Sequence, residues 1–319
     1  MNFARLVVAA SALALSAAQA QSFPSKPVRL IVPFAAGGST DIVARVLGQE
    51  LNRMWGQPVL VDNRAGGSTV IGTEIVAKAP PDGHTLLVTP APFTIVPSLA
   101  SKLPYDPHKD FEPIVLINTT PLVVVVHPAV PAKNIRELVA LAKSRPGALN
   151  YGSSGSGGSN HLAGELFNAM AGVKMVHVPY KGNAPALQDL VGGHVDVVFN
   201  GLTSALPLIK GGKLRALGMT SLKRSSALPE VPTLDEQGLK GFQAVAWNGL
   251  TAPAKTPKAI VDKINADVVK VVRAPELMEK LKAEGSDPVG SSVDAYARFL
   301  RDEIAKWNKV IRFANIKGL

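Results

Sequence analysis

The stretch VPFAAGGSTDIVAR, residues 32–45, decides how the rest of the chain is interpreted. An apolar run from Val28 to Phe34 ends in two alanines and two glycines, and an amphipathic helix is expected to start within two residues of them. This order of apolar run, glycine turn and helix start leaves three hypotheses for the junction. It holds a nucleotide phosphate, it holds a smaller anion, or it is only a tight connection.

The residue types at this junction favour an anion. Gly37 and Gly38 permit positive φ, and a helix that starts near Ser39 or Thr40 leaves several backbone N–H groups directed into one concavity. The dinucleotide fingerprint G-x-G-x-x-G is absent, and so is the Gly-Lys-Ser/Thr ending of a triphosphate loop. Asp41 in the first helical turn complements the helix dipole, but it would also repel a bare anion.

The amino terminus has the pattern of a secretory signal peptide. Arg5 precedes the apolar segment LVVAASALALSAA, and small residues at Ala18 and Ala20 flank a cleavage point before Gln21. The apolar segment is too short for a spanning helix. We therefore expect residues 1–20 to be removed and the mature chain to be exported to a bacterial periplasm.

Composition limits the possible partners and chemistry. The chain contains no cysteine, which excludes disulfides, a thiol nucleophile and thiolate metal ligands. The formal net charge is +10, or +9 without Arg5, which favours anionic partners. The basic residues are scattered and aromatic residues make up only 5% of the chain, so no strip for nucleic acid is predicted.

Apolar runs of strand length alternate with helical patterns through most of the chain. In a first block, strands are expected at 28–34, 59–62, 84–89 and 122–127. The helix after the opening stretch places four apolar side chains on one face, and this face is expected to pack on a sheet. The four are Val43, Leu47, Leu51 and Met54.

A second block begins near residue 122 and repeats this order. Strands are expected at 149–152, 175–178, 195–199 and 214–219, and helices at 134–144, 161–170 and 185–191. The carboxyl end then differs, with a strand expected at 242–250 and helices at 257–272, 275–283 and 293–313. Two βα blocks of similar size predict two α/β lobes.

The segment YGSSGSGGSNHLAGELF, residues 151–167, repeats the logic of the first junction. A short strand enters a Ser/Gly loop, and a helix starts near Asn160. A nucleophile elbow requires glycine two residues before and two residues after the serine, and none of the four serines of the loop meets that requirement. His161 has no partnered acid in view, and His161 with Glu165 lacks the further ligands of a metal site. A third glycine-rich turn, DNRAGGSTVIG at 62–72, either approaches the same site or is a plain turn.

These motifs resemble a known family, the Bug-type solute receptors, which are periplasmic binding proteins of tripartite tricarboxylate transporters. The resemblance covers nearly all of the mature chain. The segments that carry it are PFAAGGSTDIVAR, VDNRAGGSTVIG, PPDGHTLL, LPYDPHKDFEPI, YGSSGSGGSNHLAGELF, VPYKGNAPALQDLVGGHVDVVF, GGKLRALGMTS, LPEVPTLDEQG and WNGLTAPAKTP.

The resemblance implies a two-lobed α/β periplasmic-binding-protein fold of type II, a Venus flytrap whose lobes are each a mostly parallel sheet flanked by helices. The chain is expected to cross between the lobes twice. The implied organisation is a signal peptide at 1–20, the first part of lobe 1 at 21–122, lobe 2 at 123–245, and a return to lobe 1 with C-terminal helices at 246–319.

The resemblance also implies that a ligand carboxylate is held, partly through water, by the loop after the first strand and by the Ser/Gly loop of the other lobe. In this sequence, the implied ligand-binding residues are Phe34, Ala35, Ala36, Gly37, Gly38, Thr40, Asp41, Thr89, Ser153, Ser154, Ser156, Gly157, Gly158, Asn160, His161 and Asn200. Asn200 follows VDVVF where the family often has Asp, and Gly158 stands where Ser or Thr is common. Both differences concern the distal half of the ligand.

The leading hypothesis is a non-enzymatic periplasmic receptor that delivers a small carboxylate to transporter membrane subunits. It is expected to act as a monomer, without cofactor or metal and without nucleic acid. Two other hypotheses stay open at this point. One is an exported hydrolase or lyase on the same scaffold, and the other is a ligand-dependent partner of a sensor kinase.

Overall fold

The computed structural model describes residues 23–100, 102–283, 285–313 and 316. The expected signal peptide lies outside the described residues. Within the described ranges, no helix combines the length and the hydropathy that crossing a bilayer requires.

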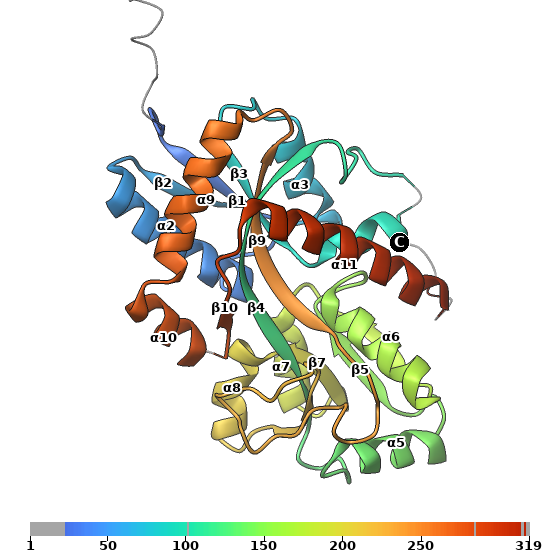
Figure 1. The fold of residues 1–319 in the computed structure, drawn as a ribbon. Helices are drawn as coiled ribbons and strands as arrows, with labels where there is room; N and C mark the ends of the chain where they lie inside the picture. Colours follow the sequence, from blue (N-terminus) through green and yellow to red (C-terminus); the bar gives the residue numbers. More distant parts are fainter. Residues whose placement is uncertain (1–22, 101, 284, 314–315, 317–319) are drawn as a thin grey trace, which may run out of the picture.

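The first part of the chain forms three parallel strands in the sheet order β2-β1-β3 (Figure 1). They are β1 (Val28–Val32), β2 (Val59–Asn63) and β3 (Thr85–Pro90). Two helices pack on one face of this sheet, α2 (Ser39–Trp55) and α9 (Lys258–Val272), and two on the other, α3 (Val70–Ala77) and α11 (Val293–Phe313). Five further elements complete this upper half: η1 (Gly67–Thr69), α4 (Pro92–Ile95), η2 (Val96–Ser98), α10 (Pro275–Ala283) and β10 (Asp287–Pro288).

The lower half in Figure 1 is built in the same way. Its strands are β5 (Asn150–Ser153), β6 (Val176–Pro179), β7 (Val197–Gly201) and β8 (Arg215–Met219). Strand β5 pairs in parallel with both β6 and β7. Its helices are α5 (Ile135–Ser144) and α6 (Ser159–Ala171), which share one apolar cluster, and α7 (Asn183–Val191) and α8 (Leu202–Lys210), which share another.

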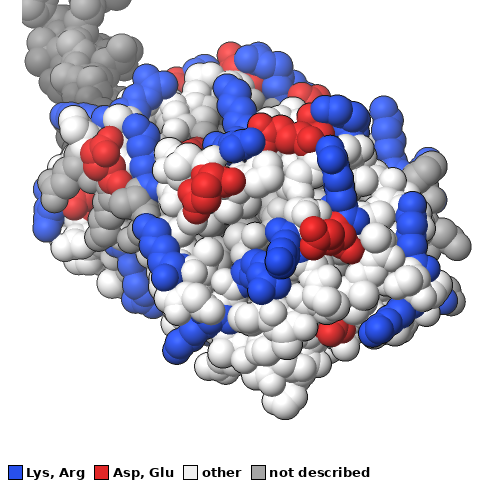
Figure 2. Space-filling model, turned by 90° about the horizontal axis from the view of Figure 1, so that it is seen from below, with Lys and Arg blue, Asp and Glu red and all other residues white. Residues whose placement is uncertain are grey.

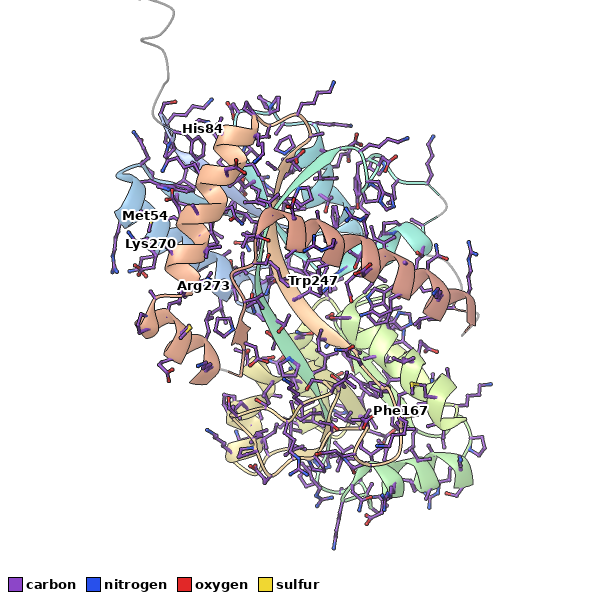
Figure 3. All side chains as sticks on the ribbon, in the orientation of Figure 1. Met54, His84, Phe167, Trp247, Lys270 and Arg273 are labelled. Atoms are coloured by element: carbon purple, nitrogen blue, oxygen red, sulfur yellow. The ribbon has the colours of Figure 1, made fainter. Side chains whose placement is uncertain are left out.

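Two long strands, β4 (Phe111–Val126) and β9 (Val245–Pro253), join the halves and run antiparallel to each other (Figure 1). Residues 111–121 of β4 pair with β9, whereas residues 122–126 pair with β7. The exchange of partners therefore lies beside the expected lobe boundary at 122/123. Trp247 of β9 packs edge-on against Phe299 of α11 at this junction (Figure 3).

The α/β fold expected from the sequence is confirmed, and the sheet that runs through the molecule is mixed. It is parallel among β1, β2 and β3 and among β5, β6 and β7, and antiparallel where β4 and β9 enter. The helices expected at 275–283 and 293–313 have those bounds in the structure. The remaining expected strands and helices occur with ends displaced by a few residues, apart from β4.

Several features differ from the sequence-based expectations. Strand β4 begins at Phe111 rather than at 122. Its first part has an apolar pattern interrupted by Pro113, and shifts of register beside Pro113 and Leu116 allow this part to stay paired with β9. Helix α8 was not among the expected elements, and it contains Pro207. On α2, Val43, Leu47 and Leu51 are buried, but Met54 is 38% exposed at the end of the helix (Figure 3).

The surface charges are distributed rather than gathered on the face that Figure 2 shows. Lys and Arg side chains are spread over this face, with Asp and Glu among them and uncharged surface around them. On this face, the net charge therefore forms no continuous basic strip of the kind that follows a nucleic-acid backbone.

Candidate functional site

Asp41 fixes the shape of the loop between β1 and α2. Its side chain is 3% exposed, and its Oδ2 accepts hydrogen bonds from the Gly37 N–H and from Arg45 Nε, both at 2.9 Å. Its Oδ1 accepts from Asn63 Nδ2, also at 2.9 Å. Burial by itself raises the pKa of Asp41, but these three donors together outweigh burial and hold that pKa below its ordinary value. The carboxylate therefore organises the loop, and Arg45 compensates its charge.

The start of α2 leaves backbone donors available. Gly38 precedes the helix, and no side chain among the described residues caps it. The N–H groups of the first turn are therefore directed beyond the helix start. Gly37 has φ +87°, whereas Gly38 has φ −82°, which any residue adopts. The sequence allowed positive φ at both glycines, and the structure uses it only at Gly37. The Gly37 N–H is already bonded to Asp41, so the free donors belong to the helix start itself.

The loop between β5 and α6 repeats this arrangement in the lower half. Gly158 precedes α6 and again no side chain caps it. Gly155 and Gly157 have φ +132° and +76°, and a Cβ on Gly158 would lie 2.9 Å from Ser154 Oγ. Ser154 Oγ donates to Asn160 Oδ1 at 3.0 Å, which orients the first turn of the helix. Two glycine-started helices thus present free N–H groups from different halves of the molecule.

The third glycine-rich turn brings the two halves into contact. Ser68 Oγ, in η1, donates a 3.0 Å hydrogen bond to the carbonyl oxygen of Ser156 in the β5–α6 loop. Ser68 and Thr69 have φ +53° and +83°, a left-handed conformation that is rare for a β-branched residue such as Thr69. Behind them, a Cβ on Gly72 would lie 2.9 Å from Pro33 Cα. The three loops, residues 33–38, 66–72 and 153–158, are therefore contiguous.

Ser68, Thr69 and Asn183 are candidate site residues that the sequence-based set omits. Asn183 begins α7 after Gly182, whose N–H donates to the Ser154 carbonyl oxygen at 3.1 Å. The Thr69 Oγ1 and Asn183 Oδ1 atoms are buried without a hydrogen-bond partner among the described residues. A glycine directly before a helical pattern, as at the other two junctions, was the available signal for Asn183. The sequence-based prediction instead started this helix at Pro185, which is two residues too late.

Two of the expected site residues lie in tightly packed surroundings. Thr89 is fully buried between β3 and β9, with its Oγ1 2.9 Å from Thr251 Oγ1. Asn200 is fully buried at the end of β7, and its Nδ2 donates to the Gly201 carbonyl oxygen and to Ser204 Oγ. Its Oδ1 has no partner in the described part of the chain. Asn200 therefore offers an acceptor, and its donors are already used.

Outside the three loops, the described residues form two surface hollows but no group of metal ligands. Hollows of about 460 and 470 Å³ lie between α2 and β2 and along α11, away from the three loops. Across residues 23–316, apart from those not described, no three His, Cys, Asp or Glu side chains are grouped so that they could share a metal ion.

Comparison with known proteins identifies the family. The sequence profile described as "Tripartite tricarboxylate transporter family receptor" matches residues 43–316. The chain belongs to this receptor family. It is 36% identical to protein BugT of Bordetella pertussis, over 99% of each chain, which agrees with the Bug-type resemblance.

Two solved relatives share the fold of this receptor closely. The R. palustris protein Rpa4515, solved with adipate, is 36% identical and superposes with a TM-score of 0.89, covering 93% of this chain and 100% of its own. MatC from Rhodopseudomonas palustris, solved with bound malate, is 35% identical with a TM-score of 0.84, covering 91% of this chain and 100% of its own. The family is one of transporter receptors, not of enzymes, and a further solved relative of 35% identity, BugD, is a periplasmic binding protein.

Proposed function

We propose that this protein is a periplasmic receptor that binds a small organic carboxylate between its two halves and delivers it to tripartite transporter membrane subunits. The observation that carries the proposal is the pair of uncapped, glycine-started helices α2 and α6, whose loops come from different halves and are joined through Ser68 and Ser156. Free helix N–H groups bind carboxylates as readily as other anions. Relatives solved with adipate and malate support the same ligand class.

In this proposal, the lobes are residues 21–122 with 246–319, and residues 123–245, and the protein acts as an exported monomer. The ligand carboxylate contacts the β1–α2 and β5–α6 loops, and Ser68 and Thr69 join the expected contact residues. Asp41 supports the first loop from behind, because its oxygens already accept hydrogen bonds from Arg45, Asn63 and Gly37.

The charges around the loops favour simple mono- and dicarboxylates over acidic amino acids. An ammonium group is held best by an uncompensated carboxylate, but the carboxylate at the β1–α2 junction, Asp41, is already paired with Arg45 at 2.9 Å. Asn200 is neutral and offers one acceptor, which a water bridging to the ligand can satisfy.

Isothermal titration calorimetry with adipate, malate, benzoate, aspartate and glutamate tests this proposal. We expect one or more of the first three to bind, and aspartate and glutamate to bind at least about tenfold more weakly, a difference of ~1.4 kcal/mol. Clear preference for the two amino acids would contradict the ligand class, and absence of binding to all five would contradict the carboxylate site. Uptake of the labelled ligand into vesicles that hold the membrane subunits, with and without the receptor, tests delivery.

A further inference from the structure

Three stacked rings lie beneath the β5–α6 loop. The proposed function includes only one of them, His161, as an expected ligand contact, and it gives the stack itself no role. They are Tyr151 of β5, His177 of β6 and His161 of α6. The ring centroids of His161 and His177 are 4.0 Å apart at 25°, and those of His177 and Tyr151 are 5.1 Å apart at 28°. Gly164 makes room for the stack, because a Cβ there would lie 2.3 Å from the Tyr151 ring.

Each imidazole holds one point of the loop. The Gly157 N–H donates to His161 Nδ1 at 3.2 Å, and His177 Nε2 lies 2.6 Å from Ser153 Oγ. Ser153 Oγ also accepts from the Gly155 N–H at 3.1 Å. Since His161 Nδ1 is an acceptor, the ring carries its proton on Nε2, the nitrogen that lies 4.0 Å from Glu165 Oε1.

The stack is built for uncharged imidazoles. Burial lowers the pKa of His161 to about 3, with the neighbouring His177 as a smaller cause, and burial lowers the pKa of His177 to about 4. Glu165 is the acidic group at the stack, and its Oε1 accepts a 2.6 Å hydrogen bond from the Tyr151 hydroxyl. Protonated His161 would direct an Nδ1–H at the Gly157 N–H, so that two donors would face each other.

We propose that His161 and His177 are positioning residues whose neutral imidazoles hold residues 153–158 in the conformation that binds the ligand carboxylate. His161 supplies a hydrogen-bond acceptor to Gly157, and His177 anchors the hydroxyl of Ser153. The expected effect on ligand affinity depends on the proposed function, whereas the expected effect on the geometry of the ligand-free loop does not. The two can therefore be tested apart.

Nitrogen-15 NMR of the histidine rings in the ligand-free wild-type protein is the first test. We expect His161 to be neutral, with its proton on Nε2, from pH 7 down to pH 5. A ring protonated on Nδ1, or one that is charged at pH 6, would overturn the proposal. This measurement needs no variant and no ligand.

Matched variants give the second test. His161→Asn keeps an acceptor at the Nδ1 position, whereas His161→Phe keeps a ring and removes the acceptor; His177→Gln and His177→Phe form the equivalent pair for Nε2. We expect the Phe variants to lose about tenfold in hydrogen-exchange protection of the 155–157 amides and about tenfold in adipate or malate affinity. The Asn and Gln variants should stay within about threefold of wild type.

His127→Phe is the control, because His127 Nδ1 accepts a backbone hydrogen bond from Ala129 at 3.2 Å in an exposed turn outside the three loops. It should leave the amides at 155–157 and ligand affinity unchanged. Unchanged protection in His161→Phe and His177→Phe would overturn the proposal. If wild type binds neither acid while the ring and amide results hold, the proposed function fails and the positioning role stands.

Discussion

At the scale of single residues, the hydrogen-bond partners of Asp41 explain how an acidic side chain can lie beside the proposed anion site. Asp41 would oppose ligand binding if its charge faced the ligand alone. In the structure, Arg45, Asn63 and the Gly37 N–H surround both of its oxygens. Charge-assisted hydrogen bonds of this kind are about twice as strong as neutral ones. Asp41 therefore stabilises the loop.

We expect Asp41→Asn to lower the free energy of unfolding at pH 7 by about 2 kcal/mol, the scale of hydrogen bonds to a charged group. Because the pKa of folded Asp41 lies below its ordinary 3.8, this stabilisation is complete above pH 3.8 and is lost as the pH falls through the folded value. Urea unfolding of the wild type and of Asp41→Asn at pH 7 and at pH 3 measures the difference in their free energies of unfolding. This difference should be smaller at pH 3.

Asp262→Asn is the matched control for this prediction. Asp262 also pairs with a cation at i,i+4 spacing, Lys258 at 2.6 Å, but its side chain is 50% exposed. Asp262→Asn should lower the free energy of unfolding by less than about 0.5 kcal/mol. Equal losses in the two variants would show that the buried contacts of Asp41 contribute nothing beyond a surface pair.

At the scale of elements, the junction of β1 with α2 depends on one glycine of the pair. Gly37 has φ +87°, and Gly38 has φ −82° with no atom closer than 3.9 Å to an added Cβ. An L-residue in the left-handed region costs about 1–2 kcal/mol, whereas alanine in place of glycine at an allowed φ is neutral or stabilising by about 0.4–1 kcal/mol.

Gly37→Ala should therefore lower the free energy of unfolding by about 1–2 kcal/mol. Gly38→Ala should lower it less, because its φ suits any residue and only the preference for glycine over alanine before a helix opposes the change. Because strain at residue 37 displaces the loop, we also expect Gly37→Ala to weaken adipate or malate binding more than Gly38→Ala does. Thermal unfolding and calorimetry measure both effects. A Gly38→Ala protein that is the less stable of the two would contradict this account of the junction.

At the scale of the whole molecule, one hydrogen bond joins the ligand loops of the two halves. Ser68 Oγ donates to the Ser156 carbonyl oxygen while Ser68 and Thr69 hold left-handed backbone conformations. Strain of this kind persists where the surrounding structure over-determines it, often at ligand clamps. Hinge closure around a ligand is a common motion of two-lobed proteins, with β4 and β9 as the connection here.

We expect saturating adipate or malate to reduce the radius of gyration of the wild-type protein in small-angle X-ray scattering. Ser68→Ala should bind the same acid about fivefold more weakly, the equivalent of ~1 kcal/mol for one net hydrogen bond. Ser144→Ala is the control, because, within the described residues, Ser144 Oγ donates to the Leu141 carbonyl oxygen of its own helix and not to either half's loops. Proven binding with an unchanged radius of gyration would argue against closure.

The sequence by itself determined the α/β class, the positions of most strands and helices, the two glycine-started helix junctions and the family. These depend on local information, namely hydrophobic periodicity and the conformational freedom of glycine beside a helix start. The sequence pattern failed where local signals conflict with the fold, as in β4, whose prolines interrupt an apolar run, and in α8, which contains Pro207.

Only the tertiary structure decided which polar groups of those junctions are free. Asn63 meets Asp41 across 22 residues, Ser68 meets Ser156 across 88, and Thr89 pairs with Thr251 across 162. His161 and His177, solitary in the sequence, share one stack because β6 and α6 pack around β5. Such pairings follow from strand register and side-chain packing over long separations, and no periodicity within one segment encodes them.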